Sequence, residues 1–366
     1  MRILHLYKDY FPVWGGIENH IKTLAEAQAA AGHEVTVLVT NPGREPGRAR
    51  LNGVEVIRAR RLATVASTPL SLSLLLWLRR QSPDITHLQF PYPLAEISQF
   101  LAGRGRPFVI SYQSDVVKQQ RILRVYEPLL RRVLASANRI IASSPQYIAS
   151  SPYLRPLADR CTVVPLAIDA QPFLSARPLF APPAQPTLLF VGRHRYYKGV
   201  DDLIKAMRNV PARLLIAGDG PMRSAWEALA HQLNLGERIR FLGDVGPGDL
   251  AGLYAAADVF VLPSNLRAEA FGIVLLEAMA AGLPCITTEL STGTSYVVQD
   301  GVTGFVVPPC SPDELSRAIN HLLADSELRR TMGEAGQGRV LREFTIEKMA
   351  ARIEAVYQEV LTFADR

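Results

Sequence analysis

The stretch EAFGIVLLEAMAAGLP (residues 269–284) holds two glutamates eight positions apart, with a glycine between them. It follows the strand-like run VFVLPS, and the part after Gly272 has a helix-forming composition that stops at the closing Gly-Leu-Pro. A helix N-terminus presents unpaired N–H groups and the positive end of the helix dipole, which together favour an anion. Glu269 would precede that terminus, and Glu277 would lie more than one turn inside the helix. The stretch therefore predicts two carboxylates on either side of an anion site.

This layout matches the chemical order of a sugar nucleotide, in which sugar hydroxyls, a diphosphate and ribose hydroxyls follow one another. Carboxylates accept hydrogen bonds from vicinal hydroxyls, and N–H groups hold phosphates. Two further interpretations stay open: a solvated helix position for Glu277, and an acid–base pair of a glycoside hydrolase. The apolar neighbours of Glu277 weigh against the first, and the anion site weighs against the second.

The composition bounds the class of protein. A chain of 366 residues is long enough for two domains, and 48% hydrophobic with 20% charged residues is typical of a globular protein. Cys161, Cys285 and Cys310 form no C-x-x-C pair, which favours reduced thiols in a cytoplasmic protein. The longest uncharged apolar stretch, residues 70–78, is shorter than the roughly 20 residues of a membrane span. The first residues, MRILHLY, lack a signal-peptide pattern and resemble a strand.

The net charge of +6 is unevenly distributed. Residues 1–180 hold 22 basic and 12 acidic side chains, whereas residues 181–366 carry a net negative charge. The basic half should prefer an anionic partner such as nucleic acid, a lipid headgroup or a phosphorylated substrate. Composition does not choose among these partners.

Short apolar runs alternate with helical stretches in both halves of the chain. The predicted strands are residues 2–7, 34–40, 54–59, 84–89, 107–112, 139–144 and 161–166, then 187–192, 212–218, 239–243, 259–264, 284–289 and 304–309. Such alternation predicts parallel sheets with helices on both faces. A proline-rich linker, residues 174–186, separates the halves.

We therefore predict an α/β fold of two Rossmann-like, doubly wound parallel-sheet domains that face each other across a cleft. The first domain is residues 1–178 together with a final helix, residues 346–366, that packs back on it. The second domain is residues 179–345. Ligands of open α/β sheets bind at the carboxyl ends of the strands, so both domains would present loops to the cleft.

Further motifs accompany the glutamate pair. These are KDYFPVWGGIENHI near the start, VGRHRYYKGVDDLIKAM after the linker, AGDGP, and LPSNLRAEAFG, which contains the first glutamate. In this order they resemble the N-terminal glycine loop, the G-R-x4-K-G element, a later glycine turn and the donor loop of retaining nucleotide-sugar glycosyltransferases of family 4. The glutamates resemble the E-x7-E motif of that family, which has the GT-B fold. The resemblance covers nearly the whole chain and is strongest to the bacterial mannosyltransferase-like branch that builds cell-surface polysaccharide.

The resemblance assigns roles to the candidate site. Arg193 and Lys198 follow a strand, where their charges can neutralise a leaving diphosphate, although two surface cations are the plainer alternative. By resemblance both contact the donor phosphates, and with Glu269 they form the predicted catalytic set. Glu269 would hold the sugar and Glu277 the ribose. The predicted donor-binding residues are Gly15, Gly16, Gln113, Arg193, Lys198, Glu269, Ala270, Phe271, Gly272, Ile273, Val274 and Glu277.

Two positions in the first half bear on the transferred sugar. Gly15 and Gly16 open a helix, where a glycine pair allows close approach of a ligand or simply makes a tight turn. Many members of the family have a histidine where this chain has Gln113. A glutamine can hydrogen-bond a sugar hydroxyl but cannot act as a charged acid or base, so a histidine-dependent role does not carry over.

The acceptor side is predicted around residues 111–135. Asp115 either caps the helix that follows it or touches the acceptor. Lys118, Arg121 and Arg124 belong to a basic amphipathic segment, residues 118–135, that could meet anionic lipid headgroups or form a solvated face. The basic first half and the lipid-diphosphate acceptors common in the resembling branch favour peripheral contact with a membrane, at the inner face of the plasma membrane.

No D-x-D motif and no metal-ligand spacing occurs in the sequence, so we expect no metal and no cofactor beyond the donor substrate. The expected activity is retaining transfer of a hexose, by resemblance mannose from GDP-mannose, to a glycan or lipid-linked acceptor in polysaccharide synthesis. A UDP-sugar or deoxyhexose donor is an alternative. A nucleotide-sugar epimerase of the same fold and a non-catalytic binder of nucleotide sugars also stay open. No nucleic-acid partner is expected.

Overall fold

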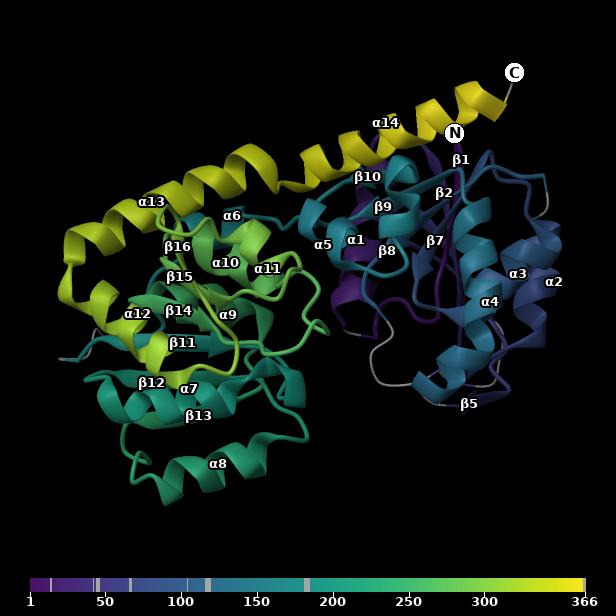
Figure 1. The fold of residues 1–366 in the computed structure, drawn as a ribbon. Helices are drawn as coiled ribbons and strands as arrows, with labels where there is room; N and C mark the ends of the chain where they lie inside the picture. Colours follow the sequence, from purple (N-terminus) through teal and green to yellow (C-terminus); the bar gives the residue numbers. More distant parts are fainter. Residues whose placement is uncertain are drawn as a thin grey trace. The chain divides into compact units, whose positions relative to one another are not determined.

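The computed structural model describes residues 1–13, 15–41, 43, 47–65, 68–103, 105–115, 120–180 and 185–364, except the side chains of residues 120–125 and 363–364. The chain forms two compact units. The first unit comprises Met1–Leu166 and Ile346–Arg366, and the second comprises Ala167–Thr345. Each unit has its own sheet, parallel throughout in the second unit and parallel except at one edge in the first (Figure 1).

The first unit is built on an eight-stranded sheet. In spatial order its strands are β10 (Cys161–Val163), β9 (Arg139–Ala142), β8 (Phe108–Tyr112), β7 (Ile85–Phe90), β1 (Arg2–Leu6), β2 (Glu34–Thr40), β4 (Val54–Ala59) and β3 (Gly47–Leu51). Neighbouring strands are parallel except β3 and β4, which form an antiparallel edge. Every residue of β7 and β8 is buried, as expected for strands covered on both faces.

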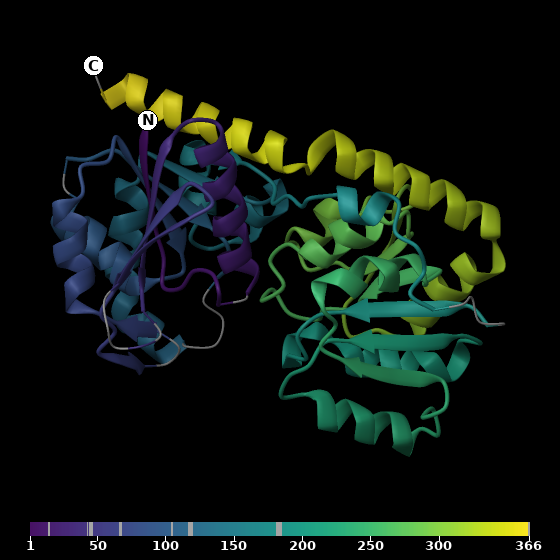
Figure 2. The same cartoon turned by 180° about the vertical axis from the view of Figure 1, so that it is seen from behind.

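Helices cover both faces of this sheet. They are α1 (Gly16–Ala30), α2 (Leu72–Arg80), α3 (Pro93–Ala102), α4 (Gln120–Ser136), α5 (Pro145–Ser150), the 3-10 helix η1 (Arg155–Arg160) and α14 (Ile346–Ala364). Helix α1 packs beside α14 on one face, and α2, α3 and α4 pack in sequence on the other (Figures 1 and 2). A small antiparallel hairpin, β5 (Ala63–Val65) with β6 (Thr68–Leu70), lies outside the main sheet.

A buried hydrogen-bond network attaches α14 to the sheet of this unit. The hydroxyl of Tyr357 lies 2.6 Å from Nδ1 of His87, and Nε2 of the same histidine lies 2.7 Å from Oγ of Ser111. Gln28 of α1 donates to the Tyr357 hydroxyl over 3.3 Å and meets Nε2 of His5 at 2.7 Å. Because buried polar groups are costly to leave unpaired, this network fixes the position of α14 on its own unit. His87 is thus a structural residue of the core.

The second unit is built on a six-stranded parallel sheet. In spatial order its strands are β13 (Ile239–Gly243), β12 (Arg213–Ala217), β11 (Thr187–Val191), β14 (Val259–Leu262), β15 (Cys285–Thr288) and β16 (Gly304–Val307). The order places β11 directly beside β14, although the two strands are far apart in the sequence. Consequently the loops that leave their carboxyl ends are neighbours.

Helices again cover both faces. They are α6 (Gln171–Leu174), η2 (Tyr196–Lys198), α7 (Val200–Ala206), η3 (Met207–Asn209), α8 (Arg223–Gln232), α9 (Pro247–Ala255), α10 (Ile273–Ala280), α11 (Thr294–Val297), α12 (Pro312–Ala324) and α13 (Ser326–Glu343). Helix α7 packs with α8 and α12, whereas α10 packs with α6, α9 and α13. Helix α10 is thus enclosed on its apolar sides, and Leu275, Leu276 and Met279 have no exposed surface.

The predicted strands and the observed strands agree closely, since each predicted run contains a strand of the sheet expected. Strand β3 and the hairpin β5–β6 were not predicted, and β3 makes the first sheet mixed rather than purely parallel. The division between the units falls after Leu166 and not at the predicted residue 178. The reason is that α6 packs on α9 and α10, and the N–H of Ile168 donates to the carbonyl of Phe344.

Candidate functional site

The candidate site of the second unit is centred on a buried ion pair. Nζ of Lys198, at the end of η2, lies 2.5 Å from Oε2 of Glu269, and the two side chains are only 10% and 11% exposed. Ser264 donates to the same carboxylate oxygen over 3.0 Å. The sequence predicted both charged residues for the donor site, but it did not predict that they contact each other.

Backbone contacts explain why the pair forms. The loop of Lys198 follows β11 and the loop of Glu269 follows β14, and these strands are neighbours in the sheet. The N–H of Asn265 donates to the carbonyl of Tyr197 over 2.9 Å. Gly199 has φ +63, and a Cβ at this position would lie 2.0 Å from the Pro263 carbonyl oxygen. A glycine is therefore required for the two loops to approach this closely.

The charge of Lys198 is stabilised within the pair. Burial alone would lower the pKa of the ammonium group, because a charged group loses hydration. The Glu269 carboxylate outweighs this effect, and the pKa of Lys198 is raised above its usual value. Lys198 is therefore cationic at neutral pH, and the ion pair holds its side chain at the carboxyl edge of the sheet.

The loop of residues 263–272, which carries Glu269, is braced by the segment that follows β15. Thr292 donates from Oγ1 to the carbonyl of Glu269 over 2.9 Å. The N–H of Gly293 donates to the carbonyl of Ala270 over 2.8 Å, and Phe271 is buried beside them. Two backbone carbonyls of the loop are thereby fixed, so the loop places Glu269 with little freedom.

The N-terminus of α10 follows this loop directly, as predicted from the sequence. Gly272 is its N-cap, with φ 81 and ψ 62, and no side chain caps the helix. The N–H of Leu275 bonds to the Gly272 carbonyl, which leaves Ile273 and Val274 as the first-turn residues whose N–H groups face outward. Both have partly exposed side chains. The helix end therefore offers the unpaired donors of an anion site, and it follows closely after Glu269 in the chain.

Glu277 lies further along α10, and a tyrosine orients it. The hydroxyl of Tyr254, on α9, donates to Oε2 of Glu277 over 2.7 Å. Although the side chain keeps some exposed surface, burial raises the pKa of its carboxyl group, and the Tyr254 hydrogen bond partly opposes the rise. The second carboxylate oxygen of Glu277 has no hydrogen-bond partner among the described residues and is free to accept from a ligand hydroxyl.

Arg193 is the second cation predicted for the donor site of this unit. It follows Gly192 after β11, its side chain is exposed, and it makes no ion pair with any residue that the structure describes. In the AGDGP turn, Asp219 accepts from the N–H of Gly220 and from the guanidinium of Arg223, so its carboxylate stabilises the turn. Arg193 thus differs from Lys198 in being free to move towards a ligand.

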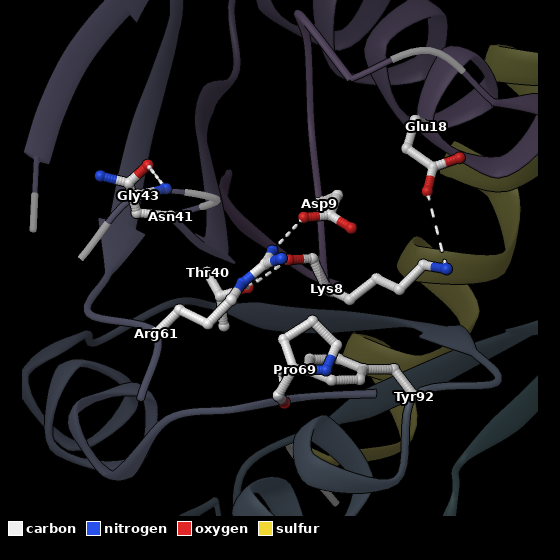
Figure 3. A network of polar contacts seen from close by, with 9 residues as sticks. All are labelled: Lys8, Asp9, Glu18, Thr40, Asn41, Gly43, Arg61, Pro69 and Tyr92. Carbon is white, nitrogen blue, oxygen red and sulfur yellow. Dashed lines mark hydrogen bonds and ion pairs between the residues drawn. The ribbon is translucent and has the colours of Figure 1, made fainter. Parts of the chain in front are cut away.

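In the first unit, Gly15 and Gly16 open α1 at the carboxyl edge of the sheet. Gly15 is the N-cap, and Glu18 lies in the first turn with its carboxylate so close to Gly15 that a Cβ there would be 2.1 Å from Oε2. Lys8 approaches Oε1 of Glu18 at 3.9 Å (Figure 3). Burial raises the pKa of Glu18, against the effects of its backbone hydrogen bond and of Lys8. No atom lies within 4 Å of a Cβ built on Gly16.

Gln113 and Asp115 follow β8 at the same edge. Gln113 is buried, and its amide donates to Oε1 of Gln89 over 3.2 Å. Asp115 accepts from the hydroxyls of Tyr112 at 2.8 Å and Ser151 at 2.9 Å. These bonds join the end of β8 to the segment after α5, so Asp115 fixes the loop that contains it. Its contact with an acceptor stays a prediction.

The predicted basic residues of the acceptor side are only partly described. Lys118 lies outside the described residues, and Arg121 and Arg124 lie in α4 with side chains outside the description. Further along the helix, Arg131 pairs with Glu127 at 2.8 Å and lies over the ring of Tyr153. The prediction of a lipid-facing α4 therefore stays a prediction.

Metal-ligand clusters and membrane-spanning helices are both missing from the described part of the chain. No group of three or more His, Cys, Asp or Glu side chains comes together there in a way that could hold a metal ion. No helix within the described ranges is long and apolar enough to cross a membrane.

Three polar side chains that support the site were not predicted from the sequence. Ser264 contacts Glu269, Tyr254 orients Glu277, and Thr292 holds the loop of Glu269. Ser264 lies within the donor-loop motif LPSNLRAEAFG, so the sequence could have predicted that it is close to Glu269. Tyr254 and Thr292 come from separate helices and loops, and only the sheet order brings them to the site.

A basic strand-to-helix loop, a neighbouring carboxylate loop and an open helix N-terminus in a doubly wound unit are typical of the class of α/β proteins that bind a nucleotide diphosphate. Comparison with known proteins agrees with this class. A family model described as "Glycosyltransferase Family 4" matches residues 14–172, and one described as "Glycosyl transferases group 1" matches residues 175–339. The chain is 34% identical to O-antigen chain mannosyltransferase C of Escherichia coli, over 99% of each chain. It is 36% identical to D-rhamnosyltransferase WbpZ of Pseudomonas aeruginosa, over 94% of this chain and 92% of the relative.

Solved structures share the architecture. Sucrose-phosphate synthase from Thermosynechococcus elongatus superposes with a TM-score of 0.83 at 25% identity, covering 99% of each chain. Anabaena Alr3699/HepE, solved in complex with UDP-glucose, superposes with a TM-score of 0.76 at 21% identity, covering 98% of this chain and 100% of that one. The protein belongs to the family 4 glycosyltransferases and has the GT-B fold.

Proposed function

We propose that this glycosyltransferase moves a hexose from a nucleotide-diphosphate sugar to a glycan or lipid-linked acceptor, with retention of configuration, in the synthesis of a cell-surface polysaccharide. The second unit would bind the donor and the first unit the acceptor. The observation that carries the proposal is the buried Lys198–Glu269 pair, of which Glu269 lies on the loop that leads directly into the open N-terminus of α10.

Each part of this arrangement has a role in the proposed transfer. Lys198 and the exposed Arg193 supply two positive charges for the diphosphate, and the first N–H groups of α10 supply hydrogen bonds. Glu269 accepts from a sugar hydroxyl with the oxygen that Ser264 and Lys198 leave open. Glu277, oriented by Tyr254, accepts from the ribose hydroxyls. Because these groups can neutralise the leaving group, we propose that transfer requires no metal ion.

The proposed reaction is a front-face displacement. The bond between the anomeric carbon and the diphosphate oxygen breaks, the acceptor oxygen attacks from the same face, and the acceptor proton passes to the departing diphosphate. Stabilisation of the diphosphate charge by Lys198 and Arg193 is then the main contribution of the protein. Gln113 would hydrogen-bond the transferred sugar without exchanging a proton.

Two relatives that match nearly the whole chain support mannose as the first sugar to test and a deoxyhexose as the second. One relative is named a mannosyltransferase and the other a D-rhamnosyltransferase. We favour GDP-mannose as donor, and the names support a role in O-antigen or a similar polysaccharide.

The test is a donor panel. Thermal shifts with GDP, UDP, GDP-mannose, GDP-rhamnose and UDP-glucose identify the base and sugar, because a ligand of the folded state raises its apparent stability. Transfer of the labelled sugar to lipid-linked glycan, with and without EDTA, and NMR of the product anomer then test the reaction. Release of an epimerised sugar without acceptor would support the epimerase instead, and an inverted anomer would overturn the retaining mechanism.

A further inference from the structure

A small polar cavity lies at the carboxyl edge of the sheet in the first unit, where Gln113 follows β8. Gln113, His20, Ser111 and Ser143 line it, and each of these residues is at least nine-tenths buried. The centre of a water molecule can occupy about 10 Å³ of this cavity, which is enough for one water and too little for a sugar or a nucleotide. We name this space the Gln113 cavity.

The strand order brings residues that are distant in the sequence to this cavity. Strands β8 and β9 are parallel neighbours, and the last pair in their register is Tyr112 with Ala142. Gln113 and Ser143 therefore leave the sheet side by side. His20 comes from α1, on the same buried stripe of the helix as Gln28, which lies two turns further on. One helix and the ends of two strands thus meet at the cavity.

Two polar atoms of the lining residues have no hydrogen-bond partner among the residues that the structure describes. They are Nε2 of His20 and Oγ of Ser143, and both atoms are buried. In native proteins, nearly all buried polar atoms are hydrogen-bonded, either to the protein or to an ordered water molecule. Two such atoms on one small cavity therefore indicate a small hydrogen-bonding ligand.

The chemistry of the lining selects an uncharged ligand. Apart from His20, the lining consists of residues without a titratable charge at neutral pH. Burial lowers the pKa of His20 to about 4, with a smaller effect of His5, so the imidazole is neutral as well. An ion would lose its hydration here without meeting an opposite charge. A water molecule fits, because it both donates and accepts and requires two to four polar partners.

The cavity also adjoins the network that attaches α14 to the sheet. Ser111 lines the cavity, and its hydroxyl lies 2.7 Å from Nε2 of His87, which in turn meets the hydroxyl of Tyr357. Ile353 of α14 is a further lining residue. A ligand in the cavity would therefore continue a buried polar chain from α14 to Gln113.

We propose that His20 and Ser143 bind one water molecule in the Gln113 cavity, and that this water fixes the orientation of the Gln113 side chain. The Gln113 amide already donates to Oε1 of Gln89 over 3.2 Å, and its backbone N–H donates to the carbonyl of Phe90 over 3.2 Å. The water supplies a second contact to the side chain, so that the amide keeps a single orientation.

His20 is then a positioning residue that acts through Gln113. A glutamine exchanges no proton, so its contribution to transfer depends on how accurately its amide is placed. This consequence rests on the proposed function, in which Gln113 contacts the transferred sugar. The binding of the water does not rest on it.

The first test is a set of crystal structures of the full chain that show ordered water. In wild type we expect a water within about 3 Å of both Nε2 of His20 and Oγ of Ser143. Ser143→Val removes the hydroxyl and fills the space, so it should expel the water and leave Gln113 in more than one conformer. His20→Leu should have the same effect. His20→Gln should keep the water, because a glutamine places a polar atom near the position of Nε2.

The second test separates positioning from stability. Ser143→Val and His20→Leu should lower kcat of transfer about tenfold or more. Their affinity for the free nucleoside diphosphate should stay unchanged, because the nucleotide is proposed to bind the second unit. His20→Gln should restore kcat. Thr86→Val is the matched control, since it removes another buried hydroxyl without a partner among the described residues of the first unit, outside the cavity lining. It should transfer as wild type.

Thermal unfolding shows whether each variant folds, and Ser143→Ala, which adds no volume, takes the place of Ser143→Val if the latter does not. Three outcomes overturn the proposal. These are a wild-type structure without a water between His20 and Ser143, a Gln113 side chain that keeps one conformer after the water is expelled, and equal kcat values for His20→Leu and wild type. Because the crystal structures require no turnover, an inactive wild type would contradict the proposed function and leave the result on the water unaffected.

Discussion

At the scale of single residues, the Lys198–Glu269 contact is the feature that sequence could not supply. Both residues belong to recognisable motifs, but their contact depends on β11 and β14 being neighbours across 71 positions of sequence. Glu277 shows the same limit. Its place on α10 follows from helical spacing, whereas its partner Tyr254 comes from a helix that packs on α10.

The ion pair can be tested for separate roles in stability and catalysis. Lys198→Met or Glu269→Leu alone leaves a buried charge without its partner, and each should cost about 3–5 kcal/mol in the free energy of unfolding. The double variant removes both charges and should lose less than the sum of the single variants. Turnover should remain low in all three variants. Lys198→Met and the double variant lack the proposed diphosphate cation, and Glu269→Leu lacks the carboxylate proposed to hold the sugar. Urea denaturation and initial rates measure the two effects, and additive stability losses would contradict the pairing.

Glycines at the two helix N-termini should respond differently to alanine. Gly272 has φ 81, and a Cβ would lie 2.9 Å from side-chain atoms of Leu262 and Leu275, so Gly272→Ala should destabilise by about 1–3 kcal/mol. Gly16 is helical with open space around it, so Gly16→Ala should leave stability unchanged or slightly raised. If Gly16→Ala lowers turnover without lowering stability, a ligand approaches that position. Thermal unfolding and the transfer assay decide, and wild-type turnover in this variant would argue against the predicted contact.

At the scale of elements, runs of β-branched and apolar residues predicted the central strands of both sheets. The edge elements were missed for a physical reason. Strand β3 has the sequence GRARL and β5 is only three residues long, so neither carries the apolar pattern of a covered strand. Strand β3 exists because it pairs antiparallel with β4, which is a tertiary condition. The hairpin β5–β6 is also outside the pattern, and it carries the exposed apolar side chains of Val65 and Leu70.

Loss of one hydroxyl group should weaken the attachment of α14. Tyr357→Phe removes the group that meets both His87 and Gln28, and it should cost about 1–3 kcal/mol because buried partners lose a hydrogen bond. Tyr10→Phe is a matched control, since the buried Tyr10 hydroxyl has no partner among the described residues and its removal should be neutral or stabilising. Hydrogen exchange of α14 should rise only in the first variant. Equal effects of the two changes would contradict the network.

At the scale of the whole molecule, the sequence predicted the two-unit architecture, because the alternation of strands and helices restarts after the proline-rich segment. It also predicted the return of the last helix to the first unit, and the structure places α14 there. The exact division was missed because residues 167–178 look like a linker in composition. Their contacts with α9, α10 and Phe344 join them to the second unit.

Buried ionisable groups of the first unit should give it opposing responses to acid. Burial lowers the pKa of His5 and of His20 from 6.5 to about 4, so the unfolded chain takes up protons first as the pH falls below 6.5. Each histidine therefore removes stability between pH 6.5 and 4. Burial raises the pKa of Glu96 from 4.5 to about 7, despite hydrogen bonds from Tyr126 and from the backbone N–H of Tyr92. Its folded form takes up the proton first, so Glu96 adds stability as the pH falls from 7 towards 4.5.

Single variants separate the two contributions. Between pH 7 and pH 5, His20→Leu should lose about 2 kcal/mol less free energy of unfolding than wild type, because it lacks one buried histidine that resists protonation. Glu96→Gln should lose about 2 kcal/mol more over the same interval, because it lacks the carboxyl that gains its proton on folding. Urea denaturation at several pH values, followed by hydrogen exchange in β1 and β7 to isolate the first unit, measures both. His231→Leu, at an exposed helical position of the second unit, is the control. If the free energy of unfolding changes with pH in the same way for wild type, His20→Leu and Glu96→Gln, then burial does not shift the pKa of His20 or of Glu96 as inferred.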